Sequence, residues 1–256
     1  MRDLARSFGR IASEYDAVRP DYAPQAVARA AEALGLGPQA RIVELAAGSG
    51  TLTRALAERF AEVVPVEPDA GMRAVLARRL PGLRVVVGAA ERIPLPDSSV
   101  DAVFVGDAFH WFDGPAAVAE MDRVLRPDRG VALLWNQWWN DGEDGATVSL
   151  EPPLPPAARA LFDDVYVRSG RAAARAEKAD PAACFAESPF GPLAVETFER
   201  RQRLSGTEVV DLYSTTSAVA SLPVTERAEL KREVLPLLGA AYRLTIITVL
   251  YWGRRA

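Results

Sequence analysis

The stretch ARIVELAAGSGTLTRALAERFAEVVPVE (40–67) decides the fold of this chain. Its apolar residues form two short runs, at 40–46 and 62–67, and between them residues 51–60 carry apolar side chains at helical spacing. A strand, a helix and a second strand in that order are typical of a βαβ unit, whose two strands lie parallel in one sheet. The sequence therefore predicts an α/β protein built on a parallel sheet.

The same alternation continues as far as residue 136. It predicts a second helix at 71–80, strands at 83–89, 100–106 and 130–136, and a helix at 115–125 between the last two strands. Crossover connections between parallel strands are right-handed in nearly all proteins, so these strands are expected to form an open sheet. The first half of the chain thus predicts a doubly wound architecture.

The second half of the chain is less regular. A stretch rich in turn formers and acidic residues, 140–156, interrupts the alternation and predicts a connection. Residues 157–169 and 206–237 are mostly helical in pattern, whereas 193–205 and 242–255 alternate like strands. We expect the two strands to complete the sheet and the helices to form a lid.

Composition limits the classes of function. The 256 residues are 49% hydrophobic and 25% charged, as in a globular protein, and 30 Lys and Arg against 34 Asp and Glu give a formal net charge of −4. Nucleic-acid binding depends on cationic neutralisation of phosphates, so no nucleic-acid partner is expected. The sequence has neither the ~18–20 uninterrupted apolar residues of a membrane helix nor an apolar signal core, which predicts a cytoplasmic protein with no membrane partner. One cysteine, Cys184, and one histidine, His110, exclude an internal disulfide and predict no metal site.

The turn between the first strand and the first helix contains two glycines, Gly48 and Gly50. Because glycine has no side chain, the backbone can bend tightly there and can approach a ligand closely, and the first amides of the helix can meet polar or anionic ligand groups. The alternative is a plain strand-to-helix turn without a ligand.

A carboxylate, Glu67, stands at the end of the second predicted strand. In doubly wound folds an acidic residue at this position accepts hydrogen bonds from ribose hydroxyls, because the ends of the first two strands border the same crevice. The alternative is that Glu67 only caps the helix that begins near Gly71. A carboxylate at a buried strand end usually needs a partner, which favours the ribose interpretation.

Two further residues distinguish the possible cofactors. A dinucleotide fingerprint requires a third glycine at position 53, where this sequence has Thr53. Glu44, at the end of the first strand, fits a cationic partner such as the amino group of an amino acid. S-adenosylmethionine carries such an amino group with a ribose and an adenine, whereas NAD carries a pyrophosphate. No lysine precedes Lys178, so the chain also lacks a Tyr-x-x-x-Lys pair, which argues against an NAD(P)-dependent oxidoreductase.

Five motifs in the first half of the chain carry a family resemblance. They are ELAAGSG (44–50), VEP (66–68) with Met72 beyond it, GAAERIPLPDSSVDAV (88–103), AFHWF (108–112) and RVLRPDRG (123–130). In this order they resemble class I S-adenosylmethionine-dependent methyltransferases, in particular the small-molecule subgroup that includes trans-aconitate methyltransferase-like enzymes and quinone C-methyltransferases. The resemblance covers roughly residues 8–136 and is weaker toward the C-terminus. Ala46 stands where the family has its first glycine.

The resemblance implies a Rossmann-like, doubly wound α/β fold. Its sheet would have seven strands, mostly parallel, with an antiparallel strand near the C-terminus, and a helical lid would accompany it. The implied domains are an N-terminal cap with the cofactor-binding core over 1–140, an inserted loop and helices forming the lid over 141–192, and the last strands of the core sheet with intervening helices over 193–256.

The resemblance also assigns residues to S-adenosylmethionine. Glu44 and the turn 46–50 would hold the methionine part, Glu67 the ribose, and Asp107 with Ala108 would lie under the sulfonium. The complete set of implied cofactor-binding residues is Tyr15, Arg19, Glu44, Ala46, Gly48, Gly50, Glu67, Pro68, Met72, Ala90, Glu91, Asp107 and Ala108.

Two groups in that set depend on the resemblance alone. Met72 would pack near the adenine, with Ala90 and Glu91 along the adenine edge. Tyr15 and Arg19 lie in a segment similar to one that closes over the cofactor in this subgroup; the alternative for them is a surface helix and a turn that ends at Pro20.

Methyl transfer from a sulfonium is an in-line displacement on an electrophile that its positive charge already activates, so alignment of the acceptor and exclusion of water are the main requirements. His110 is the candidate general base if the acceptor is a hydroxyl, and its alternative is a structural role within AFHWF. Trp111, Trp138 and Trp139 are candidates for the acceptor pocket, whereas Trp135 is expected in the core of the last strand.

The sequence therefore predicts an enzyme that transfers the methyl group of S-adenosylmethionine to an oxygen, nitrogen or carbon of a small organic molecule and releases S-adenosylhomocysteine. A monomer or a homodimer is expected. The alternative from another class is a protein that keeps this fold and cofactor but catalyses a rearrangement without methylation or only binds the cofactor.

Overall fold

The computed structural model describes residues 11–137, 150–169 and 180–255. The chain divides into two compact units. The core unit comprises Asp21–Asn136, Ala179–Phe198 and Thr248–Ala256, and the helical unit comprises Met1–Pro20, Gln137–Lys178 and Glu199–Ile247. Each unit is assembled from segments that are separated in the sequence, whereas the predicted domains, 1–140, 141–192 and 193–256, are consecutive ranges. That domain division remains a prediction.

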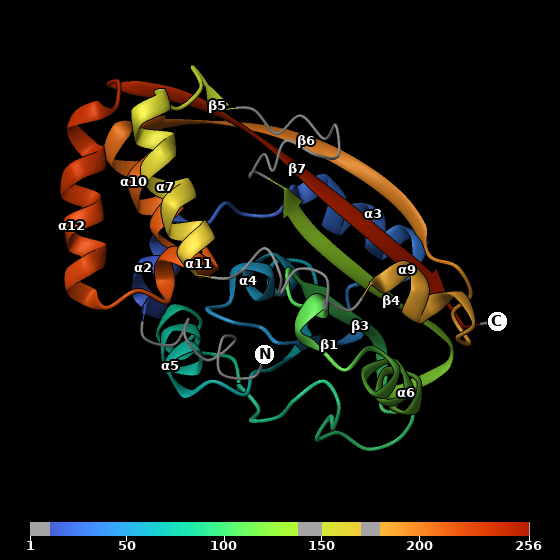
Figure 1. Ribbon diagram of the computed structural model, residues 1–256. Coiled ribbons are helices and arrows are strands. Elements are labelled where there is room, and N and C mark those ends of the chain that lie inside the picture. The colour runs from blue at the N-terminus through green and yellow to red at the C-terminus, as the bar shows by residue number, and fades with distance from the viewer. Residues whose placement is uncertain (1–10, 138–149, 170–179, 256) are drawn as a thin grey trace. The chain divides into compact units, whose positions relative to one another are not determined.

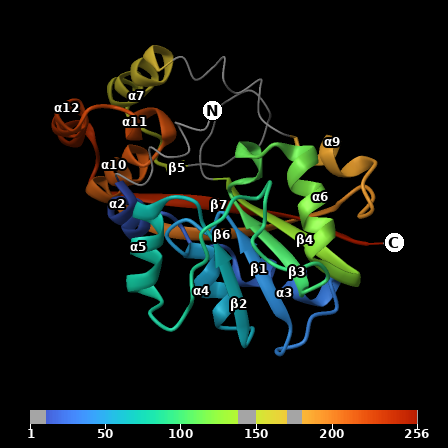
Figure 2. The ribbon, with the colours of Figure 1, turned by 90° about the horizontal axis from the view of Figure 1, so that it is seen from below.

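Parallel strands form the centre of the core unit. β2 (Glu62–Val66), β1 (Arg41–Leu45), β3 (Val100–Gly106) and β4 (Leu125–Gln137) lie side by side in that order (Figure 2), and each neighbouring pair is parallel. The order reverses at β1, whose neighbours are β2 on one side and β3 on the other. In open α/β sheets ligands bind outside the carboxyl ends of the strands at such a reversal.

Three later strands complete the sheet, as Figure 1 shows. β7 (Ala241–Arg254) lies next to β4, β5 (Leu150–Glu151) pairs antiparallel with β7, and β6 (Ala194–Ser205) also pairs with β7. The predicted mixed sheet of seven strands, mostly parallel with antiparallel pairing near the C-terminus, is confirmed.

The core unit buries both faces of its parallel strands. Alternate residues of β1 point to opposite faces, so Ile42 packs in one apolar cluster and Val43 in another. The first cluster contains α3 (Pro24–Ala33) and α4 (Thr51–Ala57), and the second contains α6 (Gly114–Val124). This two-sided burial explains the nearly continuous apolar runs of the predicted strands and confirms the doubly wound prediction.

The strand predicted at 83–89 is reduced to two isolated bridges, at Val86 and at Ala89, of which only the first joins the sheet. Val86 pairs parallel with Val66, with its amide donating to the Pro65 carbonyl at 2.8 Å and its carbonyl accepting from the Glu67 amide at 3.0 Å. The neighbouring Val87 is 63% exposed. The segment therefore borders the sheet without the burial that a longer strand would gain, and the prediction of a full strand there was wrong.

The helices agree closely with the sequence pattern. Those in the core unit include α5 (Ala70–Arg79) and α9 (Pro181–Ala186) besides α3, α4 and α6. In the helical unit all the helices that the structure describes except the first, Ala12–Val18, contribute apolar side chains to a separate cluster that includes Phe162, Val209 and Leu230. Its helices are α2 (Ala12–Val18), α7 (Pro156–Arg168), α10 (Gly206–Ser214), α11 (Ser217–Ala220) and α12 (Val224–Val234). Within the described ranges, no helix has the length and apolar character required to span a membrane.

Candidate functional site

The turn between β1 and α4 departs from ordinary backbone geometry. Ala46, Gly48 and Gly50 have φ angles of 51°, 58° and 94°, all in the left-handed region that disfavours side chains. A Cβ on Gly50 would lie 3.0 Å from Cγ of Leu76, so packing against α5 also excludes a side chain there. A Cβ on Gly48 would meet nothing within 4 Å. Gly48 therefore exposes bare backbone to open space, as close approach of a ligand requires.

The carboxylate of Glu67 contacts this turn directly. Its Oε2 accepts a hydrogen bond of 2.8 Å from the Gly48 amide, and its Oε1 accepts one of 2.8 Å from the Asp69 amide. The Ala47 amide donates to the Val66 carbonyl at 3.1 Å, so the turn is fastened to the end of β2 twice. The glycine turn and the Glu67 carboxylate, which were predicted from the sequence to border the same crevice, are therefore in direct contact.

Glu67 does not cap α5. Asp69 is the N-cap residue, and its Oδ1 accepts a hydrogen bond of 2.9 Å from the Met72 amide. Burial raises the pKa of the Glu67 carboxyl above its ordinary value, while the amides of Asp69 and Gly48 act in the opposite direction. Glu67 is 5% exposed and is therefore a buried carboxylate that joins the glycine turn to the N-cap residue of α5.

Glu44 is the most strongly perturbed acid of the site. It is 1% exposed, and burial raises its pKa to about 8, with Thr53 opposing the shift and the negative charge of Glu67 adding to it. Its Oε2 has no hydrogen-bond partner within the described residues. The same holds for the hydroxyls of Ser49 and Thr51 in the adjacent turn and helix.

Such orphaned polar atoms cost about 1–3 kcal/mol each when nothing pairs with them, so they mark a place where a ligand can supply partners. A carboxylate oxygen at the end of β1 and hydroxyls in the turn and helix that follow fit a ligand that combines a cationic amino group with hydrogen-bonding groups. The methionine part of S-adenosylmethionine has this chemistry, and these residues therefore fit that cofactor.

Ala90 and Glu91 lie in the segment that follows Val86. Ala90 is buried, and Oε1 of Glu91 accepts a hydrogen bond of 3.0 Å from the amide of Asp113, the N-cap residue of α6. On the other side of the turn, Met72 is buried in α5 and Pro68 is exposed, with its carbonyl accepting from Arg73 at 2.7 Å. The adenine role assigned to Met72, Ala90 and Glu91 stays a prediction.

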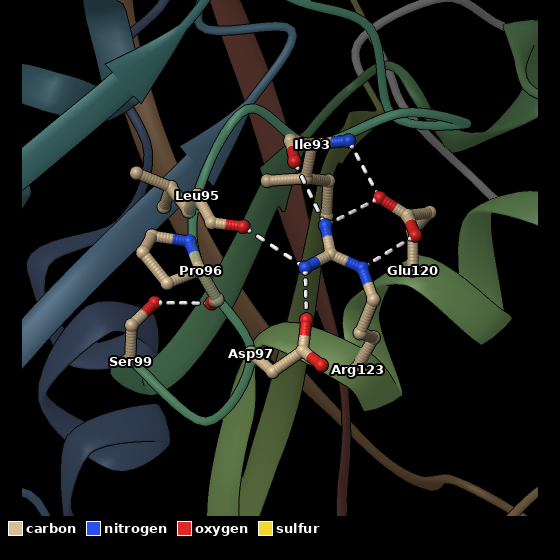
Figure 3. A network of polar contacts seen from close by, with 7 residues as sticks. All are labelled: Ile93, Leu95, Pro96, Asp97, Ser99, Glu120 and Arg123. Carbon is tan, nitrogen blue, oxygen red and sulfur yellow. Dashed lines mark hydrogen bonds and ion pairs between the residues drawn. The ribbon is translucent and has the colours of Figure 1, made fainter.

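A polar network fixes the loop beyond Glu91 onto α6 (Figure 3). The guanidinium of Arg123 donates to the carbonyls of Ile93 and Leu95 and pairs with the carboxylates of Asp97 and Glu120, at distances from 2.6 to 2.9 Å. These bonds raise the pKa of Arg123 and keep it charged. Glu120 also accepts a hydrogen bond of 2.8 Å from the Ile93 amide. The Arg123–Glu120 pair therefore binds both an amide and carbonyls of the loop backbone.

Asp107 and Ala108 follow β3 at its carboxyl end. Asp107 has a φ of 49°, and its amide donates to the Leu134 carbonyl at 2.8 Å. Its Oδ1 accepts from the Asn136 amide at 3.1 Å and its Oδ2 from the hydroxyl of Tyr22 at 2.9 Å. The sequence analysis did not identify Tyr22 or Asn136, because no local motif signals a contact between residues so far apart in the chain.

His110 and Trp111 form a short 3₁₀ helix, Phe109–Trp111, directly after Ala108. Their rings lie 4.8 Å apart, both are half-buried, and Trp111 packs against the apolar cluster around α6. Trp135 lies in β4, is half-buried, and packs edge-on against Tyr251 at 5.3 Å beside the apolar cluster around α6, so it borders the core in which it was expected. Trp138 and Trp139 lie outside the described residues, so their part in an acceptor pocket, like the base role of His110, stays a prediction.

Tyr15 and Arg19 belong to the helical unit. The guanidinium of Arg19 lies 4.5 Å from the centre of the Tyr15 ring and donates to the hydroxyl and the carbonyl of Thr215, at 3.0 and 2.8 Å. The two residues thus form a cation–π pair anchored at the end of α10. Their contact with the cofactor stays a prediction.

Comparison with known proteins agrees with this geometry. Residues 43–133 match the family model described as a methyltransferase domain. An uncharacterized methyltransferase of Mycobacterium tuberculosis (strain H37Rv) is 43% identical over 135 residues, 53% of this chain and 54% of that protein. The demethylmenaquinone methyltransferase of Beutenbergia cavernae is 36% identical over 133 residues, 51% of this chain and 55% of that protein. The chain spans about half the length of the curated relatives it matches.

A solved structure extends the similarity of fold. The chain aligns with a putative type II methyltransferase from Anaeromyxobacter dehalogenans with a TM-score of 0.60 and 23% identity, over 92% of this chain and 97% of that one. The fold is that of class I methyltransferases, the class whose cofactor is S-adenosylmethionine. The match to the methyltransferase domain family covers residues 43–133, the stretch that contains the glycine turn and Glu67.

Proposed function

We propose that this protein transfers the methyl group of S-adenosylmethionine to an oxygen, nitrogen or carbon atom of a small organic molecule. One observation carries the proposal: the turn that exposes bare backbone at Gly48 and the carboxylate of Glu67 are joined by a 2.8 Å hydrogen bond at the reversal of the strand order. In doubly wound folds generally, nucleotide ligands bind at this point of the sheet.

The chain's own residues would do three things at this site. The carboxylate of Glu67, fixed by two backbone amides, would accept hydrogen bonds from ribose hydroxyls. Glu44 would accept the cationic amino group, and the hydroxyls of Ser49 and Thr51 would complete the polar surroundings of that end of the cofactor. The cofactor, when bound, supplies an electrophilic methyl group activated by the positive sulfur. The remaining catalytic requirement is alignment of the acceptor, which can contribute about 7–11 kcal/mol to lowering the barrier.

Charge and composition support the finer parts of the proposal. A net charge of −4 favours a small-molecule acceptor over a nucleic acid, and we propose a cytoplasmic location on the same sequence grounds as above. Among the relatives, the demethylmenaquinone methyltransferase and the malonyl-[acyl-carrier protein] O-methyltransferase of Methylococcus capsulatus carry names that indicate different kinds of acceptor, so the acceptor atom is left open between oxygen, nitrogen and carbon.

The test is incubation of the purified protein with S-adenosylmethionine carrying an isotopic methyl label, against a panel of small hydroxyl, amine and activated-carbon acceptors. The expected result is label in one acceptor class together with calorimetric binding of S-adenosylhomocysteine. Tight binding with no transfer to any acceptor would instead favour a protein that uses the bound cofactor for a rearrangement or as a signal. Binding of NADH alone would overturn the assignment.

A further inference from the structure

Asp107 is held in an unusual conformation at the carboxyl end of β3. Its φ of 49° lies in the left-handed region, where a residue with a side chain is strained, although aspartate tolerates this region better than most residues. Strain of this kind persists only where the surroundings fix it, and it concentrates at functional sites. The contacts that fix Asp107 are therefore informative.

Two donors fix the plane of the Asp107 carboxylate. The Tyr22 hydroxyl donates to Oδ2 at 2.9 Å, and the Asn136 amide donates to Oδ1 at 3.1 Å. Tyr22 is 6% exposed and therefore cannot exchange this bond freely for water. Bonds from neutral donors to an ionised carboxylate are stronger than bonds between neutral groups.

The fold makes room for Tyr22 at a specific glycine. A Cβ on Gly106, the residue before Asp107, would lie 2.6 Å from the Tyr22 hydroxyl oxygen, closer than any real contact of that kind. Gly106 has no positive φ that would itself require glycine. The absence of a side chain at 106 is explained by the ring that lies over it.

The contacts of Asp107 close into a ring. Tyr22 is followed by Ala23, whose amide donates to the hydroxyl oxygen of Thr248 at 3.0 Å. The Thr248 hydroxyl donates to Oδ1 of Asn136 at 2.6 Å, and the backbone amide of Asn136 returns to Asp107. Ala23 and Thr248 are completely buried. The ring joins the start of α3, β3, β4 and β7 within the core unit. Asp107 is therefore held on one side by the buried Tyr22 and on the other by the half-buried Asn136, which the buried Thr248 hydroxyl fixes in turn.

We propose that Tyr22 is a positioning residue that orients the carboxylate of Asp107 toward the cofactor site, with Thr248 supporting it from the opposite side of the ring. The inference rests on the proposed function, because it requires that Asp107 take part in binding the cofactor. Neither Tyr22 nor Thr248 belongs to the glycine turn or to the carboxylates that bind the ligand in the proposed function.

The test is a double-mutant cycle on S-adenosylhomocysteine affinity, measured by calorimetry with Tyr22→Phe, Asp107→Asn and the combined variant. Asparagine also tolerates the left-handed conformation, so Asp107→Asn removes the carboxylate charge and keeps the backbone conformation. Tyr22→Phe should lower affinity about tenfold, and the combined variant should bind no more weakly than Asp107→Asn alone. Tyr242→Phe is the matched control: it removes a hydroxyl that accepts from the Gly239 amide in the helical unit, and it should leave affinity unchanged.

Each outcome decides a separate point. If the unaltered protein does not bind S-adenosylhomocysteine, the proposed function fails and the inference fails with it. If the unaltered protein binds and Tyr22→Phe binds equally well, or if the effects of the two exchanges simply add, the positioning role is overturned while the proposed function stands. Should Tyr22→Phe not fold, Thr248→Ser and Thr248→Val decide: serine keeps the hydroxyl and should preserve affinity, valine removes it and should lower affinity, and equal affinities would overturn the inference.

Discussion

The backbone amide of Gly48 donates a 2.8 Å hydrogen bond to Oε2 of Glu67 and so joins the turn after β1 to the end of β2. The bond gives the buried carboxylate a partner from the protein and fixes its plane next to the exposed backbone of the turn. If the proposed cofactor binds here, a fixed acceptor and accessible backbone are in place before it arrives, which lowers the entropic cost of binding.

Glu67→Ala should weaken binding of S-adenosylhomocysteine by about 1.5–3 kcal/mol, the usual range for hydrogen bonds to a charged group. It should also lower stability, because the amides of Gly48 and Asp69 lose their acceptor. Calorimetry and chemical unfolding measure the two effects separately. Glu62→Ala, at the exposed start of the same strand, is the control and should leave affinity unchanged. Unaltered affinity in a folded Glu67→Ala variant would remove Glu67 from the ribose role.

Glu44 should make stability depend on pH. Burial raises the pKa of its carboxyl from 4.5 to about 8 in the folded protein, so between these values the folded state keeps a proton that the unfolded chain has released. This contribution to the free energy of unfolding therefore falls as pH rises through that window. Glu44→Gln should remove it and be more stable than the unaltered protein by about 1–3 kcal/mol at pH 8, with little difference near pH 4.5.

Urea unfolding across that pH range is the measurement, and Glu58→Gln, at the exposed C-cap of α4, is the control that should keep the pH dependence of the unaltered protein. An identical pH dependence in Glu44→Gln and the unaltered protein would contradict the prediction.

Glu44 should also make cofactor binding depend on pH. Only the ionised carboxylate attracts a cationic amino group strongly. Because the pKa of Glu44 in the free protein is about 8, Glu44 must release a proton before it can bind the amino group at lower pH. Affinity for S-adenosylhomocysteine should therefore rise as pH approaches 8, with release of a proton visible in calorimetry as a dependence on the ionisation enthalpy of the buffer. Glu44→Gln should show weaker binding and no linked proton. Proton uptake on binding would argue against an interaction of Glu44 with the amino group.

Ala46→Gly should stabilise the protein. Alanine at a φ of 51° carries about 1–2 kcal/mol of left-handed strain, which exceeds the roughly 0.5–1 kcal/mol that glycine costs through its freer unfolded chain. The expected net gain is about 0.5–1 kcal/mol in the free energy of unfolding. Ala47, one residue further, has no positive φ, so Ala47→Gly should lower the free energy of unfolding. Chemical unfolding of the two variants tests whether their effects have opposite signs.

His110→Ala separates a base from a structural residue. If His110 removes a proton from a hydroxyl acceptor, turnover should fall by about 10²–10⁴-fold while affinity for S-adenosylhomocysteine is preserved. A structural role in the turn Phe109–Trp111 predicts near-normal turnover with a lower free energy of unfolding. Initial rates with the labelled cofactor, measured beside thermal unfolding, distinguish the two outcomes.

Much of this architecture could be read from local patterns. The strands β1 to β4, the helices between them, the glycine turn and the carboxylate at position 67 all follow from short-range signals: apolar periodicity, turn residues and the position of a charged residue at a strand end. The fold class and the joint location of Gly48 and Glu67 were therefore predictable, since parallel strands place their carboxyl ends at one edge of the sheet.

The details that depend on distant parts of the chain could not be predicted in this way. Segment 83–89 reads as a strand, but its limited pairing follows from its exposed position beside β2. The bond between Tyr22 and Asp107 joins residues 85 positions apart, and that between Thr248 and Asn136 joins residues 112 apart.

The sequence by itself determined the order of the elements, because helix and strand periodicity depend on near neighbours. Only the tertiary structure decided how deeply Glu44 is buried and which side chains surround Asp107. Burial and hydrogen-bond partners are properties of the packed chain, in which segments remote in sequence become neighbours.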